Sequence, residues 1–146
     1  MATPSDCAAG SYATGVSANG TAVCSTSWHF TWTPMIMGSF GSSTTTALGG
    51  AWEPSASIKL TRIDVFLGTA MVGCTTFPVI GVYDYTSSAW IATATLGYNS
   101  TSHFYNAVSG TVTAGHNIGI GVQTADAGCG TQPAYPQITV EYTMNQ

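Results

Sequence analysis

The ionisable side chains of this chain are few, and no catalytic motif gathers them. The carboxylates are Asp6, Glu53, Asp64, Asp84, Asp126 and Glu141, and the histidines are His29, His103 and His116. Glycoside hydrolysis needs two carboxyl groups that face each other, and the sequence leaves open a pair such as Glu53 with Asp126. A Ser-His-Asp arrangement is also open, but no Gly-x-Ser-x-Gly motif occurs. We therefore expect a non-catalytic protein.

Metal binding has little support in the sequence. Asp84 precedes Thr86 and Ser87 in "VYDYTSS", where an aspartate typically accepts hydrogen bonds from the backbone two residues on, so we expect it to cap a turn. Loops that carry Asp84 or Asp126 lack the carboxylate-rich run of a calcium loop. No Cys-x-x-Cys pair or Cys/His cluster predicts zinc. We expect no cofactor and no metal.

The four cysteines, Cys7, Cys24, Cys74 and Cys129, can form disulfides or remain buried thiols. Four cysteines allow three pairings. Proximity along the chain favours Cys7 with Cys24, which leaves Cys74 with Cys129. Disulfides persist in oxidising compartments, so this pairing predicts an extracellular or virion location.

Aromatic side chains indicate a binding function, because the chain has four Trp, seven Tyr and five Phe. Sugars stack on aromatic rings, whose flat faces are apolar, and their hydroxyls need polar partners. The candidate glycan-binding residues are Trp52, Tyr98, His103, Tyr105 and Asp126. An inward-packed Phe104 or Tyr105 is the alternative interpretation of this region. Trp28 and Trp32 fit a core or a subunit interface better than a sugar site.

The low charge excludes several classes of partner. Only 5% of residues are charged and the formal net charge is −4 at pH 7, against about 25% charged residues in an ordinary domain. Nucleic acids and anionic membranes need clustered Lys or Arg, so we expect neither as a partner. No apolar run approaches the roughly 18 residues of a membrane span.

The segments that carry these residues alternate apolar and polar side chains with a period of two, which predicts antiparallel strands. The clearest strands are at 27–33, 89–96, 117–123 and 136–144, and weaker ones are at 36–40, 44–51, 103–106 and 108–113. Segment 57–66 changes parity at Thr61 and Arg62, which predicts a β-bulge. Segment 77–85 is apolar on both faces, as in a central strand that begins near Pro78. The pattern predicts an all-β, antiparallel two-sheet sandwich that is jelly-roll-like.

The first third of the chain contains a separate feature, the sequence "CAAGSYATGVSANGTAVCS" at 7–25. Its side chains are too small for a core, and Asn19-Gly20 is a hairpin signal. A disulfide closing this loop would contribute about 3 kcal/mol. We expect a disulfide-stapled connector and N-terminal strand at 1–33, followed by the sandwich domain at 34–146.

Two motifs resemble a known group of domains. The pattern "CxxGxYxTGVxxxGxxxCS" and the segment "LTRIDVFLGTA…IGVYDYTSSAWIATATL" are similar to the C-terminal β-sandwich domains of phage tail-fibre-like and bacterial surface adhesin-like proteins. The resemblance implies a distal, often trimeric, receptor-binding or adhesive module, and it carries over no catalytic residues. The pair Cys74 and Cys129 departs from the usual pattern.

Together these observations predict an extracellular or virion-associated module that binds a receptor glycan at the tip of a fibre. We expect a homo-oligomer, either a trimer or an open fibre. One alternative is a structural subunit of a fibre or capsid, assembled by β-strand contacts that use the apolar run Met35–Met37. A second is an accessory domain of a carbohydrate-active enzyme.

Overall fold

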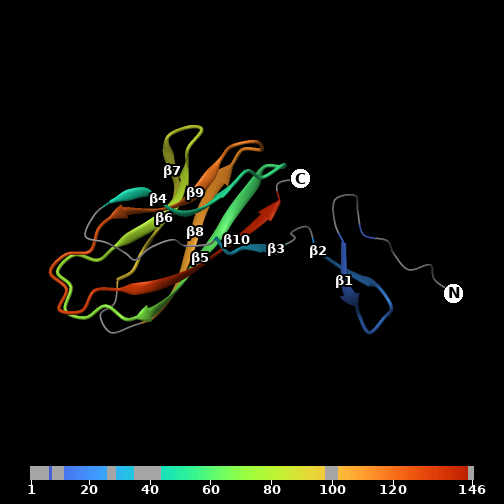
Figure 1. The fold of residues 1–146 in the computed structure, drawn as a ribbon. Helices are drawn as coiled ribbons and strands as arrows, with labels where there is room; N and C mark the ends of the chain where they lie inside the picture. Colours follow the sequence, from blue (N-terminus) through green and yellow to red (C-terminus); the bar gives the residue numbers. More distant parts are fainter. Residues whose placement is uncertain (1–6, 8–11, 26–28, 35–43, 98–101, 145–146) are drawn as a thin grey trace.

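The computed structural model is all-β and describes residues 7, 12–25, 29–34, 44–97 and 102–144. The described strands are β1 (Tyr12–Val16), β2 (Ala22–Ser25), β3 (His29–Trp32), β4 (Thr45–Trp52), β5 (Ile58–Thr69), β6 (Val79–Asp84), β7 (Ala89–Thr95), β8 (His103–Val112), β9 (Ile118–Thr124) and β10 (Ala134–Met144). Strands β1 and β2 form a hairpin, and the other eight form two packed antiparallel sheets (Figure 1). None of the described segments is a helix that could cross a membrane.

The order of the strands is that of a jelly roll. One sheet has the order β3-β10-β5-β8 and the other β4-β9-β6-β7. Strand β3 therefore pairs with β10, β4 with β9, β5 with β8 and β6 with β7. This nested pairing is what results when one long antiparallel ribbon folds over itself. This confirms the predicted two-sheet sandwich.

The core lies between the two sheets and comes from alternate residues of their strands. Ile63, Val65, Ile118, Ile120, Val122, Ile138 and Val140 are each at most 1% exposed. Their removal from water is the main favourable contribution to folding. The residues between them point outward and form the outer faces of the sandwich.

The predicted bulge in β5 is confirmed. Against β10, Arg62 pairs with Glu141 and Leu60 pairs with Tyr142, so that Thr61 has no partner in the register. Leu60 and Ile63 can therefore both reach the core, and Arg62 takes a place on the outer face.

The N-terminal hairpin contains the predicted Cys7–Cys24 disulfide. Asn19-Gly20 forms its turn, where Gly20 has a φ of 83° and its amide donates to the Ser17 carbonyl at 2.8 Å. Figure 1 shows the hairpin set apart from the sandwich. Strand β3, which we grouped with the connector, pairs with β10 in the sandwich.

The segments expected as separate strands at 103–106 and 108–113 form the single strand β8. The strand expected at 36–40 lies outside the described residues.

The second predicted disulfide, Cys74–Cys129, is also present. It joins the loop after β5 to the loop before β10, and isolated bridges between Val72 and Thr131 and between Thr76 and Ala127 flank it. Two disulfides fit an extracellular protein.

Aromatic side chains close one edge of the sandwich, where β3 and β4 end the two sheets. The ring centroids of Trp52 lie 5.3 Å from Trp32 and 5.2 Å from Tyr142, and Phe30 stacks on Tyr142 at 5.5 Å. Trp32 is partly buried and packs against the core, which is one of the two environments predicted for it, the other being a subunit interface. Trp28 lies outside the described residues.

Candidate functional site

The outer face of the β3-β10-β5-β8 sheet has a shallow groove of about 320 Å³. Its lining comes from β5, β8 and β10: Arg62, Asp64, Val65, Phe66, His103, Tyr105, Gln137, Thr139 and Glu141. We call this the outer groove. It brings together two of the five predicted ligand-binding residues, His103 and Tyr105.

Strand β8 presents these two residues to solvent. Its residues alternate, so Phe104 turns into the core at 5% exposure while Tyr105 is 65% exposed. Phe104 or Tyr105 could have packed inward, and the structure shows that Phe104 does so. A tyrosine that remains so exposed contributes little to packing and is free to contact a ligand.

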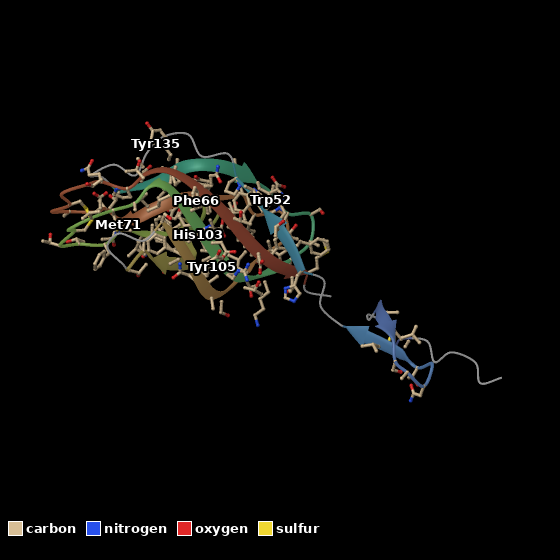
Figure 2. The ribbon with its side chains drawn as sticks, turned by 90° about the horizontal axis from the view of Figure 1, so that it is seen from below. Trp52, Phe66, Met71, His103, Tyr105 and Tyr135 are labelled. Atoms are coloured by element: carbon tan, nitrogen blue, oxygen red, sulfur yellow. A yellow bond between two sulfur atoms is a disulfide. The ribbon has the colours of Figure 1, made fainter. Side chains whose placement is uncertain are left out.

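Three aromatic rings form a row along the outer groove. The ring of His103 is 4.9 Å from Phe66 and 5.2 Å from Tyr105, measured between centroids. Figure 2 shows Phe66, His103 and Tyr105 one after another across the sheet. Phe66 is 39% exposed. The row is a largely apolar platform on a face that is open to water.

Charged groups border the row and largely compensate one another. Arg62 Nη2 lies 2.7 Å from both Asp64 Oδ2 and Glu141 Oε1, and Arg62 Nε donates to Asp64 Oδ2 at 2.9 Å. The hydrogen bond to Asp64 is the main cause that raises the pKa of Arg62. The guanidinium carbon is 5.8 Å from the centroid of the Tyr105 ring, a cation–π distance that helps to orient the ring.

Uncharged polar groups complete the lining. Gln137 and Thr139 project from β10 into the outer groove and can donate and accept hydrogen bonds. Asp64 Oδ1 is buried and has no hydrogen-bond partner among the described residues. A ligand hydroxyl that reached this oxygen would supply a bond that the protein does not make.

The remaining predicted ligand-binding residues do not line the outer groove. Trp52 belongs to the aromatic edge between β3 and β4 and packs against the core. Asp126 is 3% exposed and its Oδ2 lies 3.4 Å from Cys129 Sγ, in the disulfide-linked loops. Tyr98 lies outside the described residues. Their role in ligand binding therefore stays a prediction.

A second polar centre surrounds Asp84, which is 2% exposed. Asp84 Oδ1 accepts hydrogen bonds from the amides of Thr86 and Ser87 at 2.8 and 3.2 Å, which confirms the predicted turn cap. Asp84 Oδ2 lies 2.7 Å from both the Ser87 hydroxyl and His116 Nδ1. Burial opposes ionisation, but the hydrogen bonds from His116, Ser87 and Thr86 outweigh it and lower the pKa of Asp84 to about 2.

This centre has the residue types of a Ser-His-Asp triad without its geometry. The Ser87 hydroxyl donates to Asp84, whereas a nucleophilic serine would donate to the histidine. The arrangement instead ties the β6–β7 turn to the segment before β9. Over the part of the chain that the structure describes, no group of three or more His, Cys, Asp or Glu residues could hold a metal ion.

Sequence reasoning did not identify Phe66 and Arg62 as site residues. Both stand in the segment where the change of parity was recognised. Counting the alternation on from the bulge would have placed Arg62, Asp64 and Phe66 on the outer face. The sequence alone does not show that these residues lie beside His103 and Tyr105 of β8, because strand pairing joins segments that are far apart in the chain.

Comparisons of the chain with protein-family models, with curated proteins and with solved structures find no match. A functional inference therefore depends on the geometry of the outer groove.

Proposed function

We propose that this protein is an extracellular, non-catalytic module that binds neutral glycans in the outer groove. The observation that carries the proposal is the exposed row of Phe66, His103 and Tyr105, bordered by Gln137 and Thr139. Neighbouring rings in the row are tilted by 67° and 42°, so each can offer an apolar contact beside hydrogen-bonding side chains to a sugar ring, which has apolar CH faces and a rim of hydroxyls.

The charge of the outer groove favours neutral sugars over acidic ones. Arg62 faces two carboxylates, Asp64 and Glu141, at 2.7 Å, so its positive charge is already compensated. The three groups together carry one negative charge at pH 7. An incoming sulfate or sialic acid carboxylate would meet this excess negative charge and would have to displace Arg62 from its partners.

The resemblance of the sequence to fibre and adhesin domains supports a setting at the tip of a fibre, extracellular or on a virion. A shallow and open groove binds one sugar segment weakly, so several copies on one assembly would raise the overall affinity. The purely structural alternative would need no ligand in the groove.

A glycan array that contains neutral, sialylated and sulfated glycans tests the proposal, with wild type and the Tyr105→Ala variant applied in parallel. We expect wild type to bind neutral glycans in preference to acidic ones and Tyr105→Ala to lose most of that signal. Tyr105→Phe is the matched control, since it keeps the ring. Absence of binding to any glycan, or equal binding by wild type and Tyr105→Ala, would favour the structural subunit.

A further inference from the structure

Tyr135 combines high exposure with an unfavourable backbone conformation. It is 77% exposed, and its φ of 53° lies in the left-handed region, which residues other than glycine, asparagine and aspartate seldom adopt. Pro136 follows it and further disfavours such a conformation. Backbone outliers of this kind concentrate at functional sites and persist only where the surrounding structure fixes them.

The pairing of β10 with β5 fixes this conformation. Ala134 pairs with Thr69 and Pro136 pairs with Leu67, so both neighbours of Tyr135 are held in the sheet. The ring lies over Gly68, where an added Cβ would stand 3.0 Å from Tyr135 Cβ and 3.6 Å from Cγ. Glycine at 68 leaves room for this arrangement, and a larger residue there would have to push the Tyr135 side chain outward by a few tenths of an ångström.

Gly68 stands two residues beyond Phe66 on the same outer face of β5. Tyr135 therefore continues the row of Phe66, His103 and Tyr105 beyond the end of the outer groove. Figure 2 shows it projecting at the far side of Phe66 from His103 and Tyr105. From Asp64, which pairs with Tyr105, to Gly68 the strand advances by about 13 Å, which is longer than one sugar ring.

We infer that the outer groove continues over Gly68 to Tyr135 and binds an extended stretch of a neutral polysaccharide, with Tyr135 as a separate stacking position for a distal sugar. The inference rests on the proposed function and adds the class of ligand. A site for one terminal sugar would need only the rings around His103. Four aromatic side chains in succession, the last one held in an unfavourable conformation, match a chain of several sugars.

The test is calorimetric titration with cello-, xylo-, manno- and chito-oligosaccharides, each as a disaccharide, a tetrasaccharide and a hexasaccharide. Wild type should bind the hexasaccharide of the recognised series at least tenfold more tightly than the disaccharide. Tyr135→Asn removes the ring and keeps a residue that tolerates the left-handed conformation. It should lose about tenfold in affinity for the hexasaccharide, which corresponds to about 1.4 kcal/mol, and less than twofold for the disaccharide.

Two control variants separate this inference from the proposed function. Tyr135→Phe should bind like wild type, and Tyr105→Ala should lose affinity for every length. Tyr135→Gly repeats the test should the asparagine variant fold poorly. Affinity that does not rise with length, or an unchanged hexasaccharide affinity in Tyr135→Asn and Tyr135→Gly while Tyr105→Ala loses binding, overturns the extended site alone. No binding by wild type to any of these oligosaccharides overturns the extended site, whereas the proposed function is overturned only if wild type also binds no neutral glycan on the array.

Discussion

The buried carboxylate of Asp84 should make the stability of the sandwich sensitive to acid. Burial disfavours its charged form, but hydrogen bonds from His116, Ser87 and Thr86 lower the pKa from 3.8 to about 2. The folded state therefore binds fewer protons than the unfolded chain between these values, and stability falls as the pH drops from about 4 to 2. The difference in pKa corresponds to about 2 kcal/mol in the free energy of unfolding.

Urea unfolding at a series of pH values measures this loss. Asp84→Asn should have lower stability at pH 7, because the amide cannot replace both carboxylate oxygens as acceptors, and should lack this part of the acid dependence. An Asp84→Asn variant whose stability falls as steeply between pH 4 and 2 as that of wild type would assign the dependence to other carboxylates.

Single residues differ in how far their roles can be read from the sequence. The turn cap at Asp84 follows from turn chemistry that acts over a few residues, whereas alternation along 103–106 leaves open which of Phe104 and Tyr105 faces the core. Tyr135 gives no such signal, because its left-handed backbone depends on its neighbours' pairing with β5. The position of Tyr135 over Gly68 depends on the pairing of β10 with β5, which are far apart in the sequence.

At the level of elements, the two disulfides should contribute unequally to the stability of the sandwich. Cys74–Cys129 spans 55 residues and joins two loops that each connect one sheet to the other, β5 to β6 and β9 to β10. The paired change Cys74→Ser and Cys129→Ser should lower the free energy of unfolding by up to about 4 kcal/mol in the chain-entropy model. Thermal and urea unfolding of the purified variant measure the loss.

The hairpin disulfide supplies the control for this experiment. Cys7–Cys24 closes a local segment of 17 residues that Figure 1 shows apart from the sandwich. The paired change Cys7→Ser and Cys24→Ser should therefore leave the unfolding of the sandwich within about 0.5 kcal/mol of wild type. A large loss here would mean that the hairpin and the sandwich unfold as one unit.

Most strands could be predicted from alternation, and the bulge at Thr61 could be predicted from a change of parity. The interruption expected near Ala107 is absent, because Ala107 pairs with Arg62 of β5 and β8 therefore continues as one strand. The partners of each strand had no local signal, because register depends on contacts between distant segments. The outer groove requires three paired strands, and of its residues only His103 and Tyr105 on β8 were predicted from the sequence as ligand-binding residues.

For the whole molecule, we expect self-association, with a homotrimer as the first choice and an open fibre as the second. The apolar run Met35–Met37, which lies outside the described residues, and the resemblance to fibre domains support this expectation. Light scattering on the purified chain, with and without reductant, measures the oligomeric state. A monomer at high protein concentration would contradict it.

The jelly roll relates to the proposed function through the separation of its two faces. The nested pairing of strands puts the apolar side chains between the sheets and leaves the outer face of β5, β8 and β10 to carry aromatic and polar side chains. The side chains on that outer face can therefore be substituted without disturbing the core. The sequence could predict this division, but it could not identify the face that carries the groove.

The central claim is that the outer groove binds neutral glycans by stacking on Tyr105 and its neighbours. Its most direct test is calorimetric titration of wild type, Tyr105→Ala and Tyr105→Phe with the neutral oligosaccharide that binds best, at low and at high salt. We predict that Tyr105→Ala loses about tenfold or more in affinity and that Tyr105→Phe stays within about threefold of wild type, where one hydroxyl is lost. Salt should change the affinity little, because stacking on neutral sugars involves no net charge. Equal affinity of wild type and Tyr105→Ala, or binding that disappears at high salt, would contradict the claim.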